Sequence, residues 1–279
     1  MAAVLGAALL HALWNSLVKS SGDKFLTSAR VCLWCGVIAF AAALALPTPN
    51  CASAGFILAS AIIHVLYFAL VGRLYRTADL SVAYPLMRGV APLIAALIAG
   101  VTLREIPSPL ALVGVIALVT GVATMGLSGL AHGRVDRATI GVALVNSVII
   151  AVYSVIDGEG ARLAGPTALH AFAYNARADA LTAAFYAPLL LAYRGASMAR
   201  GLARDPLRSA AGGAAVFGGY ALVVWAMTQT EIAAVAALRE CSVVFAALIG
   251  VVFLGEPFRR ARATAALLIL AGVVALKLG

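Results

Sequence analysis

Short polar clusters divide this chain into long apolar runs. Ten runs are each close to the roughly 20 residues that an α-helix needs to cross a bilayer. They cover residues 2–19, 26–46, 54–73, 80–102, 107–127, 138–157, 168–192, 209–228, 232–254 and 258–278. Gly, Pro and charged residues occupy the breaks, as in Gly22-Asp23-Lys24 and Gly165-Pro166. The pattern predicts an all-α integral membrane protein with ten transmembrane helices.

The second half of the chain repeats the first. Slid forward by 151 positions, Arg88 falls on Arg239, Glu105 on Glu256 and Gly121 on Gly272. Residues 1–127 and 138–279 hold five runs each, joined by a polar linker at 128–137. Two tandem copies of a unit with an odd number of spans must insert with opposite orientations. We therefore expect one transmembrane domain, residues 1–279, built as a 5+5 inverted repeat around a central cavity.

Composition agrees with a membrane protein. The chain is 63% hydrophobic and 11% charged, whereas soluble domains are about 25% charged, so the lipid bilayer is its expected environment. Of the 20 Lys and Arg, thirteen follow odd-numbered runs, three follow even-numbered runs or lie near the chain end, and four lie inside runs. This distribution marks topology and not a nucleic-acid partner, and it predicts cytoplasmic odd-numbered loops with both termini outside.

Polar residues inside the runs are the candidates for function, because an ionisable group at membrane depth costs about 2.5–3.5 kcal/mol. Tyr84 and Arg88 share one face of the fourth run by their i, i+4 spacing. Arg239 occupies the equivalent depth in the ninth run and is followed by Glu240. Neighbours on a helix point about 100° apart. Two interpretations follow: one residue faces the cavity while the other pairs with another helix, or the two belong to a structural ion pair.

Further candidates lie on four other runs. His11, Trp14 and Asn15 form a stripe on the first run, and Arg177 has polar neighbours on the seventh. The predicted substrate-binding set is Arg88, Tyr84, Arg239, Glu240, His11, Trp14, Asn15, Tyr67, Tyr153, Tyr174 and Arg177. Glu240 and Asp179 are the predicted proton-coupling residues. We interpret His64, Cys32 and Cys35 as packing residues, and Glu105 as a residue that caps a helix.

No catalytic or cofactor motif stands out in the sequence. It contains neither H-E-x-x-H nor a G-x-x-x-x-G-K-[ST] loop, and its four Cys form no metal-ligand framework. We therefore expect no enzymatic activity, no cofactor and no metal site. Transport energy would come from a gradient, with protons as the candidate coupling ion.

Several short motifs resemble the drug/metabolite transporter superfamily, in its EamA-type branch. The motifs are Ala29-Arg30 with its counterpart Ala176-Arg177, the segment Ala-Tyr-Pro-Leu-Met-Arg-Gly-Val-Ala-Pro at 83–92, and the turns Leu-Gly-Glu-Pro at 254–257 and Leu-Arg-Glu-Ile at 103–106. The resemblance implies a ten-helix carrier that works by alternating access around a central cavity. Members of the family export amino acids and other metabolites, and some import or exchange small solutes.

These observations favour one function over two alternatives. We expect a multi-pass protein of the bacterial cytoplasmic (inner) membrane that moves a small polar or zwitterionic metabolite, of the amino acid or organic anion type, with export as the favoured direction. The protein would act as a monomer or a homodimer. The alternatives are a multidrug exporter of lipophilic cations and a carrier of a lipid-linked intermediate. The excess of Arg over acidic residues inside the runs argues against the cation exporter.

Overall fold

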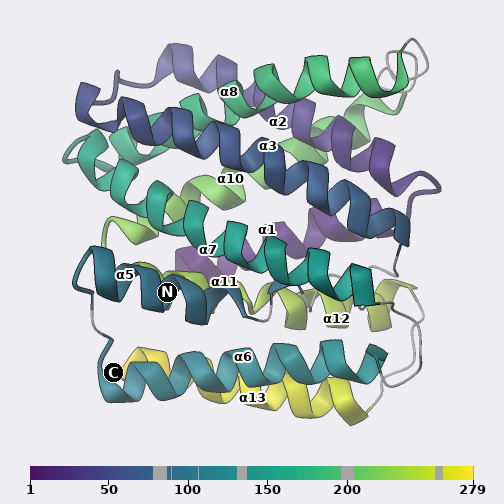
Figure 1. Ribbon diagram of the computed structural model, residues 1–279, viewed down its shortest axis with the longest axis vertical. Coiled ribbons are helices and arrows are strands. Elements are labelled where there is room, and N and C mark those ends of the chain that lie inside the picture. Colours follow the sequence, from purple (N-terminus) through teal and green to yellow (C-terminus); the bar gives the residue numbers. More distant parts are fainter. Residues whose placement is uncertain are drawn as a thin grey trace.

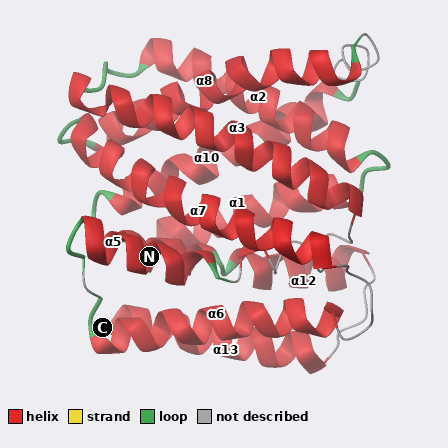
Figure 2. Ribbon diagram, in the orientation of Figure 1, coloured by secondary structure: helices red, strands yellow, loops and turns green. Residues whose placement is uncertain are grey.

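The described part of the chain is helical. The computed structural model describes residues 1–77, 87–88, 90–105, 107–130, 137–195, 204–254 and 260–278. Its helices are α1 (Ala2–Lys19), α2 (Lys24–Ala45), the short 3₁₀ helix η1 (Cys51–Ser53), α3 (Ala54–Thr77), α5 (Ala91–Thr102), α6 (Pro109–Leu130), α7 (Arg137–Ala164), α8 (Ala168–Arg194), α10 (Pro206–Met227), α11 (Ile232–Arg239), α12 (Ser242–Leu254) and α13 (Arg260–Leu278). The described residues form no strand (Figure 2).

The helices lie side by side along a common direction, and the two termini lie at the same end of the bundle (Figure 1). Within the described residues, six segments are long and apolar enough, by length and composition, to cross a membrane. In α5, α6 and α13 the apolar stretches within the described residues are shorter than a full span. Helix α8 has 27 residues, but its polar side chains, among them Asn175, Arg177 and Asp179, lower its hydropathy.

Local sequence explains where several helices begin. The Asp23 carboxylate accepts a hydrogen bond from the Leu26 N–H at 2.9 Å and caps α2. The Ser108 hydroxyl accepts one from the Ala111 N–H at 3.1 Å at the start of α6. Helix α10 begins at Pro206, where the missing N–H costs nothing because the first turn has no acceptor for it. These caps hold the helix ends at the surfaces of the bundle.

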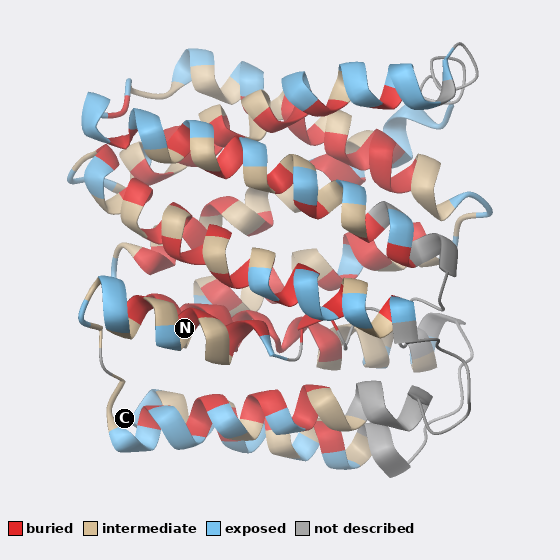
Figure 3. Cartoon of the chain, in the orientation of Figure 1, coloured by how far each residue is buried: buried red, intermediate tan, exposed pale blue. Residues whose placement is uncertain are grey.

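Burial shows the inverted pattern of a protein in lipid (Figure 3). Large apolar side chains are exposed on the outside, as at Leu44 (75%) and Val101 (84%). The interior contains fully buried polar and charged groups, among them Asn146, Asp157 and Arg88. A bilayer stabilises such an apolar exterior, while the polar groups of the interior need partners or a solute.

Helices α6 and α13 pack against each other and lie together along one edge of the bundle (Figure 1). A Cβ atom on Gly114 would come within 2.8 Å of the Gly272 carbonyl oxygen, and one on Gly121 within 2.9 Å of the Ala265 carbonyl oxygen. Only glycine allows the two backbones to approach this closely. Small residues at these positions therefore allow the two helices to pack closely.

The predicted ninth run, residues 232–254, is interrupted at its centre. Helix α11 ends at Arg239 and α12 begins at Ser242. Between them the N–H groups of Glu240 and Cys241 bond to the carbonyls three residues earlier, at 3.0 and 3.1 Å, which tightens the backbone as in a 3₁₀ turn. In the first half, α5 begins at Ala91, which is 151 positions before Ser242 (242 − 91). The two halves therefore begin a helix at equivalent positions inside the bundle.

Candidate functional site

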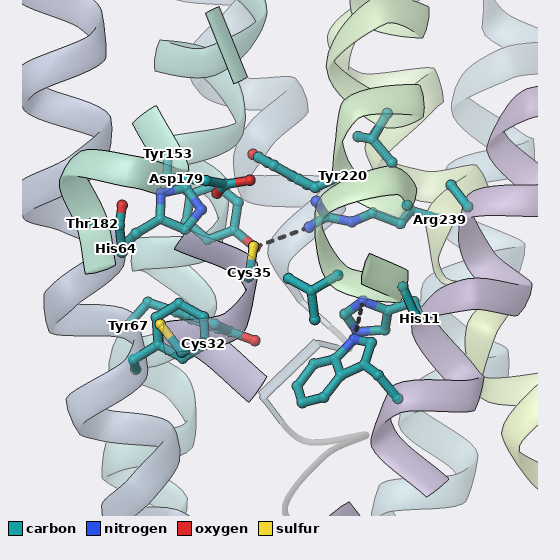
Figure 4. Close-up of a pocket in the computed structure, with 17 residues that line it drawn as sticks. His11, Cys32, Cys35, His64, Tyr67, Tyr153, Asp179, Thr182, Tyr220 and Arg239 are labelled. Atoms are coloured by element: carbon teal, nitrogen blue, oxygen red, sulfur yellow. Dashed lines mark hydrogen bonds between the residues drawn. The ribbon is translucent and has the colours of Figure 1, made fainter. Parts of the chain in front are cut away.

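A cavity lies inside the bundle, between helices of both halves of the chain (Figure 4). It has an atom-free volume of about 680 Å³, including the part that is open to its surroundings. Helices α1, α2, α3, α7, α8, α10 and α11 contribute its walls. The lining residues are Ala7, His11, Trp14, Cys32, Cys35, His64, Tyr67, Phe68, Tyr153, Asp179, Thr182, Ala215, Val216, Gly219, Tyr220, Val223 and Arg239.

The cavity contains one buried guanidinium, that of Arg239 at the end of α11. The residue is 3% exposed. Its Nη2 donates to the Tyr153 hydroxyl at 3.1 Å, and its Cζ lies 5.7 Å from the Tyr153 ring centre and 5.6 Å from that of Tyr220. Its Nε has no hydrogen-bond partner, and among the described residues no carboxylate lies within 4.0 Å of the guanidinium. The charge is thus supported by aromatic faces and one phenol, with a donor left over.

The neighbouring carboxylate, Glu240, is bound to Arg88. The Arg88 Nη2 donates to Glu240 Oε1 at 2.6 Å, and Nε donates to Oε2 at 2.9 Å. The two side chains are 1% and 2% exposed. This geometry is a forked, charge-assisted pair in a nearly dry environment. Glu240 therefore neutralises the arginine of the other half of the chain and leaves Arg239 free to face the cavity.

His11 connects this ion pair to the cavity wall. Its Nε2 lies 3.4 Å from Arg88 Nη1, and its Nδ1 accepts a hydrogen bond from Trp14 Nε1 at 3.2 Å. Both His11 and Trp14 line the cavity (Figure 4). His11 therefore lies between the Arg88–Glu240 pair and the cavity.

Aromatic rings and a carboxylate form another part of the lining. His64 lies 4.3 Å from Tyr153 between ring centres and 5.5 Å from Tyr220. Behind them the Asp157 carboxylate, fully buried, accepts hydrogen bonds from the hydroxyls of Tyr174 and Tyr220. Asp179 itself lines the cavity and accepts a bond from Asn175 Nδ2 at 3.0 Å. The cavity therefore offers a guanidinium, a carboxyl group and ring faces to a solute.

A family model and a solved structure are similar to this chain. The model of the EamA-like transporter family matches residues 138–278. The chain belongs to the EamA-like transporter family. No curated protein matches the chain significantly. Among solved structures, one titled "Crystal structure of protein" is similar over 99% of this chain and 95% of its own, with a TM-score of 0.74 and 21% sequence identity. That likeness shows a shared fold.

The family confirms the resemblance noted in the sequence, and this EamA-like transporter is a multi-pass membrane protein of the drug/metabolite transporter superfamily. Of its predicted substrate-binding residues, five line the cavity: His11, Trp14, Tyr67, Tyr153 and Arg239. The predicted proton-coupling residue Asp179 lines it too. Tyr84 lies outside the described residues.

The remaining predicted residues that the structure describes do not line the cavity. Arg88 and Glu240 form their buried pair, and the Tyr174 hydroxyl binds Asp157. Asn15 uses its amide to bond the carbonyl of His11 at 2.8 Å on its own helix. Arg177 points to the end of α2, where it donates to the Ala43 carbonyl at 3.3 Å, one of the last four carbonyls that a helix leaves without an intrahelical partner.

Several lining residues were not predicted from the sequence of this EamA-like transporter. Cys32, Cys35 and His64 were interpreted as packing residues, yet all three line the cavity. Tyr220 was not singled out. The sequence feature that could have identified it is a lone Tyr in a Gly- and Ala-rich run, next to Gly218 and Gly219. A hydroxyl at that membrane depth needs a partner.

Proposed function

We propose that this protein is a secondary transporter that moves a small polar or zwitterionic metabolite across the bacterial inner membrane by alternating access, with export as its direction. The solute would carry a carboxylate that binds Arg239. One observation carries this proposal: Arg239 is buried at the cavity with an unused Nε donor, while the adjacent acid is bound to Arg88. A buried guanidinium without an acid favours an anionic ligand, and its planar fork suits a carboxylate.

The same cavity offers a partner to an amine. Asp179 lines it, and the faces of Tyr67, Tyr153 and Tyr220 would support an ammonium or an apolar side chain. A zwitterion such as an amino acid would bind Arg239 through its carboxylate and Asp179 through its ammonium group. Glu240 and Asp179 are our candidates for proton coupling.

The arrangement of the halves supports a ten-helix 5+5 inverted repeat with halves at 1–127 and 138–279 and a linker at 128–137. Under the offset of 151, Gly114 corresponds to Ala265 and Gly121 to Gly272. In the α6–α13 contact, Gly114 meets Gly272 and Gly121 meets Ala265. Equivalent positions thus exchange partners across the contact, which is what an approximate two-fold axis between the halves requires.

Transport in proteoliposomes tests the proposal. The purified protein would be reconstituted and offered labelled amino acids and organic anions in both gradient directions, with and without a pH gradient. We expect saturable transport of at least one carboxylate-bearing solute, reduced more than tenfold in Arg239→Gln and partly retained in Arg239→Lys. Lys277→Gln, an exposed residue in the last turn of α13, is the control for loss of one positive charge. Equal transport by wild type and Arg239→Gln would overturn the proposal.

One observation favours a second candidate, an exporter of lipophilic cations: several aromatic rings and Asp179 line the cavity. Two buried acids outside the cavity lining are engaged, Glu240 by Arg88 and Asp157 by two phenols. Uptake of a fluorescent lipophilic cation by the same proteoliposomes, abolished by Asp179→Asn and unaffected by Arg239→Gln, would select this function instead.

A further inference from the structure

A second hollow lies at the end of the bundle opposite the two termini, where α1 ends and α2 and α10 begin (Figure 1). Its atom-free volume is about 590 Å³. The lining residues are Leu17, Ser20, Ser21, Gly22, Asp23, Thr27, Arg30, Val31, Asp205, Arg208 and Ser209. Hydroxyl and charged side chains predominate, in contrast to the largely aromatic and apolar wall of the main cavity.

Arg30 is the buried cation of this hollow. It is 9% exposed, and its Nη1 and Nη2 donate at 3.0 Å to the Arg204 carbonyl and the Thr27 hydroxyl. Its Nε has no hydrogen-bond partner. The Asp205 carboxylate lies 3.8 Å from Nη1, beyond hydrogen-bond distance, on a side chain that is 72% exposed. Its one nearby carboxylate is thus exposed and not hydrogen-bonded to it, so the Arg30 charge favours an incoming anion.

Arg208 brings a second guanidinium to the same wall. Its Nη2 donates to the Ser20 hydroxyl at 2.6 Å and to the Leu17 carbonyl at 3.3 Å. The other acid of the lining, Asp23, is used as the cap of α2 through its bond to the Leu26 N–H. Helices α2 and α10 both begin beside the hollow, so the positive ends of two helix dipoles act in the same direction as the two arginines.

The hollow and the main cavity share three helices. On α1, Trp14 lines the cavity, and Leu17, one turn later, lines the hollow. On α2, Cys32 lines the cavity, and the adjacent Val31 lines the hollow. Between the two spaces, α10 packs closely through Gly212, where a Cβ atom would lie 2.7 Å from Val31 Cγ2. Leu17 and Val31 are therefore apolar residues of the hollow that lie close in sequence to residues of the cavity wall and pack against Gly212.

We propose that this hollow at the end of the bundle is a second binding site for the anionic group of the transported solute, with Arg30 and Arg208 as its ligands. The inference rests on the proposed function for its link to transport. A carboxylate would take the place of Asp205 beside Arg30 Nη1 and would also bind the Arg208 guanidinium.

Charge-selective labelling tests the anion site without knowledge of the solute. In a Cys51→Ser background, Ser21→Cys places a thiol in the lining. We would compare its reaction with two methanethiosulfonates, one bearing a sulfonate and one a trimethylammonium, each relative to free cysteine, after subtracting labelling of the background protein. We expect the sulfonate reagent to be favoured by about fivefold. Arg30→Gln should remove the preference and Arg30→Lys should keep it. No preference, or preference for the cation, would overturn the proposal.

Protection by anions separates the two arginine sites. At constant ionic strength, sodium acetate or inorganic phosphate should slow labelling of Ser21→Cys, and choline chloride should not. The protection should persist in Arg239→Gln and disappear in Arg30→Gln or, if that variant does not fold, in Arg208→Gln. Protection that requires Arg239 and not Arg30 would refute a second binding site in the hollow. If labelling behaves as expected but no carboxylate is transported in proteoliposomes, the proposed function fails and the anion site stands.

Discussion

The buried ion pair between Arg88 and Glu240 can be tested by removing one charge at a time. Glu240→Gln keeps the shape of the side chain and leaves the Arg88 guanidinium without its carboxylate. Arg88→Gln does the reverse. The double variant Arg88→Gln/Glu240→Gln removes both charges and retains polar groups that can bond to each other.

The structure sets the size of the expected effect. Arg88 donates to Glu240 through Nε and Nη2, and both side chains are at most 2% exposed. Removing one partner of such a pair leaves an uncompensated buried charge, which typically costs about 3–5 kcal/mol. For a chain of this size that corresponds to a fall in melting temperature on the order of 10 °C. The double variant should lose much less than the sum of the two single variants, because no charge is stranded.

The melting temperatures of the purified variants would be compared in one detergent. Samples would be heated, and size-exclusion chromatography would measure how much protein remains unaggregated. Lys277→Gln again serves as the control, since its side chain is exposed near the end of α13. Single variants as stable as the wild type would show that the pair does not form. Equal and additive losses would show that the two charges do not interact. Either result would also remove our reason for assigning the unpaired charge of the cavity to Arg239.

Three further predictions follow from other contacts. Gly272→Val should destabilise the protein by about 1–3 kcal/mol in the same thermal assay, because its Cβ would lie 2.7 Å from the Gly114 carbonyl; Gly141→Val, with open space around its Cβ, is the control. Tyr220→Phe should lower stability and keep solute affinity, whereas Tyr220→Leu should weaken affinity about fivefold in a binding assay, because it removes a ring from Arg239. Glu105→Ala should lower the free energy of unfolding in the same thermal assay by about 1–2 kcal/mol more than Glu105→Gln, because Gln keeps an oxygen that can accept from the Ile232 N–H and Ala does not.

The arrangement of apolar runs in the sequence predicted the helices well, because bilayer thickness fixes the length of each span. The predicted run 2–19 and helix α1 have the same bounds, and the predicted start of the tenth run, 258, lies near Arg260. The interruption at Glu240 was not predicted. Hydropathy averages over about 20 residues, so a two-residue turn inside an apolar segment leaves almost no signal.

The site was predicted in part, for a physical reason. A residue type shows that a polar side chain at depth needs a partner, but it does not show which partner it finds. His11 and Arg239 could thus be selected from the sequence, while the sequence alone could not assign Glu240 to Arg88 across 152 positions. Arg177 was selected for the same reason as Arg239, yet it binds a helix carbonyl. Glu105 was predicted to cap the helix that follows its own turn, but it accepts a hydrogen bond from the Ile232 N–H at the start of α11, 127 positions away.

The two equivalent arginines explain how a repeated scaffold can hold one asymmetric site. Arg88 and Arg239 are 151 positions apart, but the residue after Arg88 is Gly89 and the residue after Arg239 is Glu240. The pair of halves therefore contains two guanidiniums and one acid at this depth. Because the turn after α11 directs Glu240 toward Arg88 and Arg239 toward Tyr153, the acid neutralises the arginine of the other half. Arg239 remains at the cavity without this acid, and the carboxylate of the proposed solute would bind there.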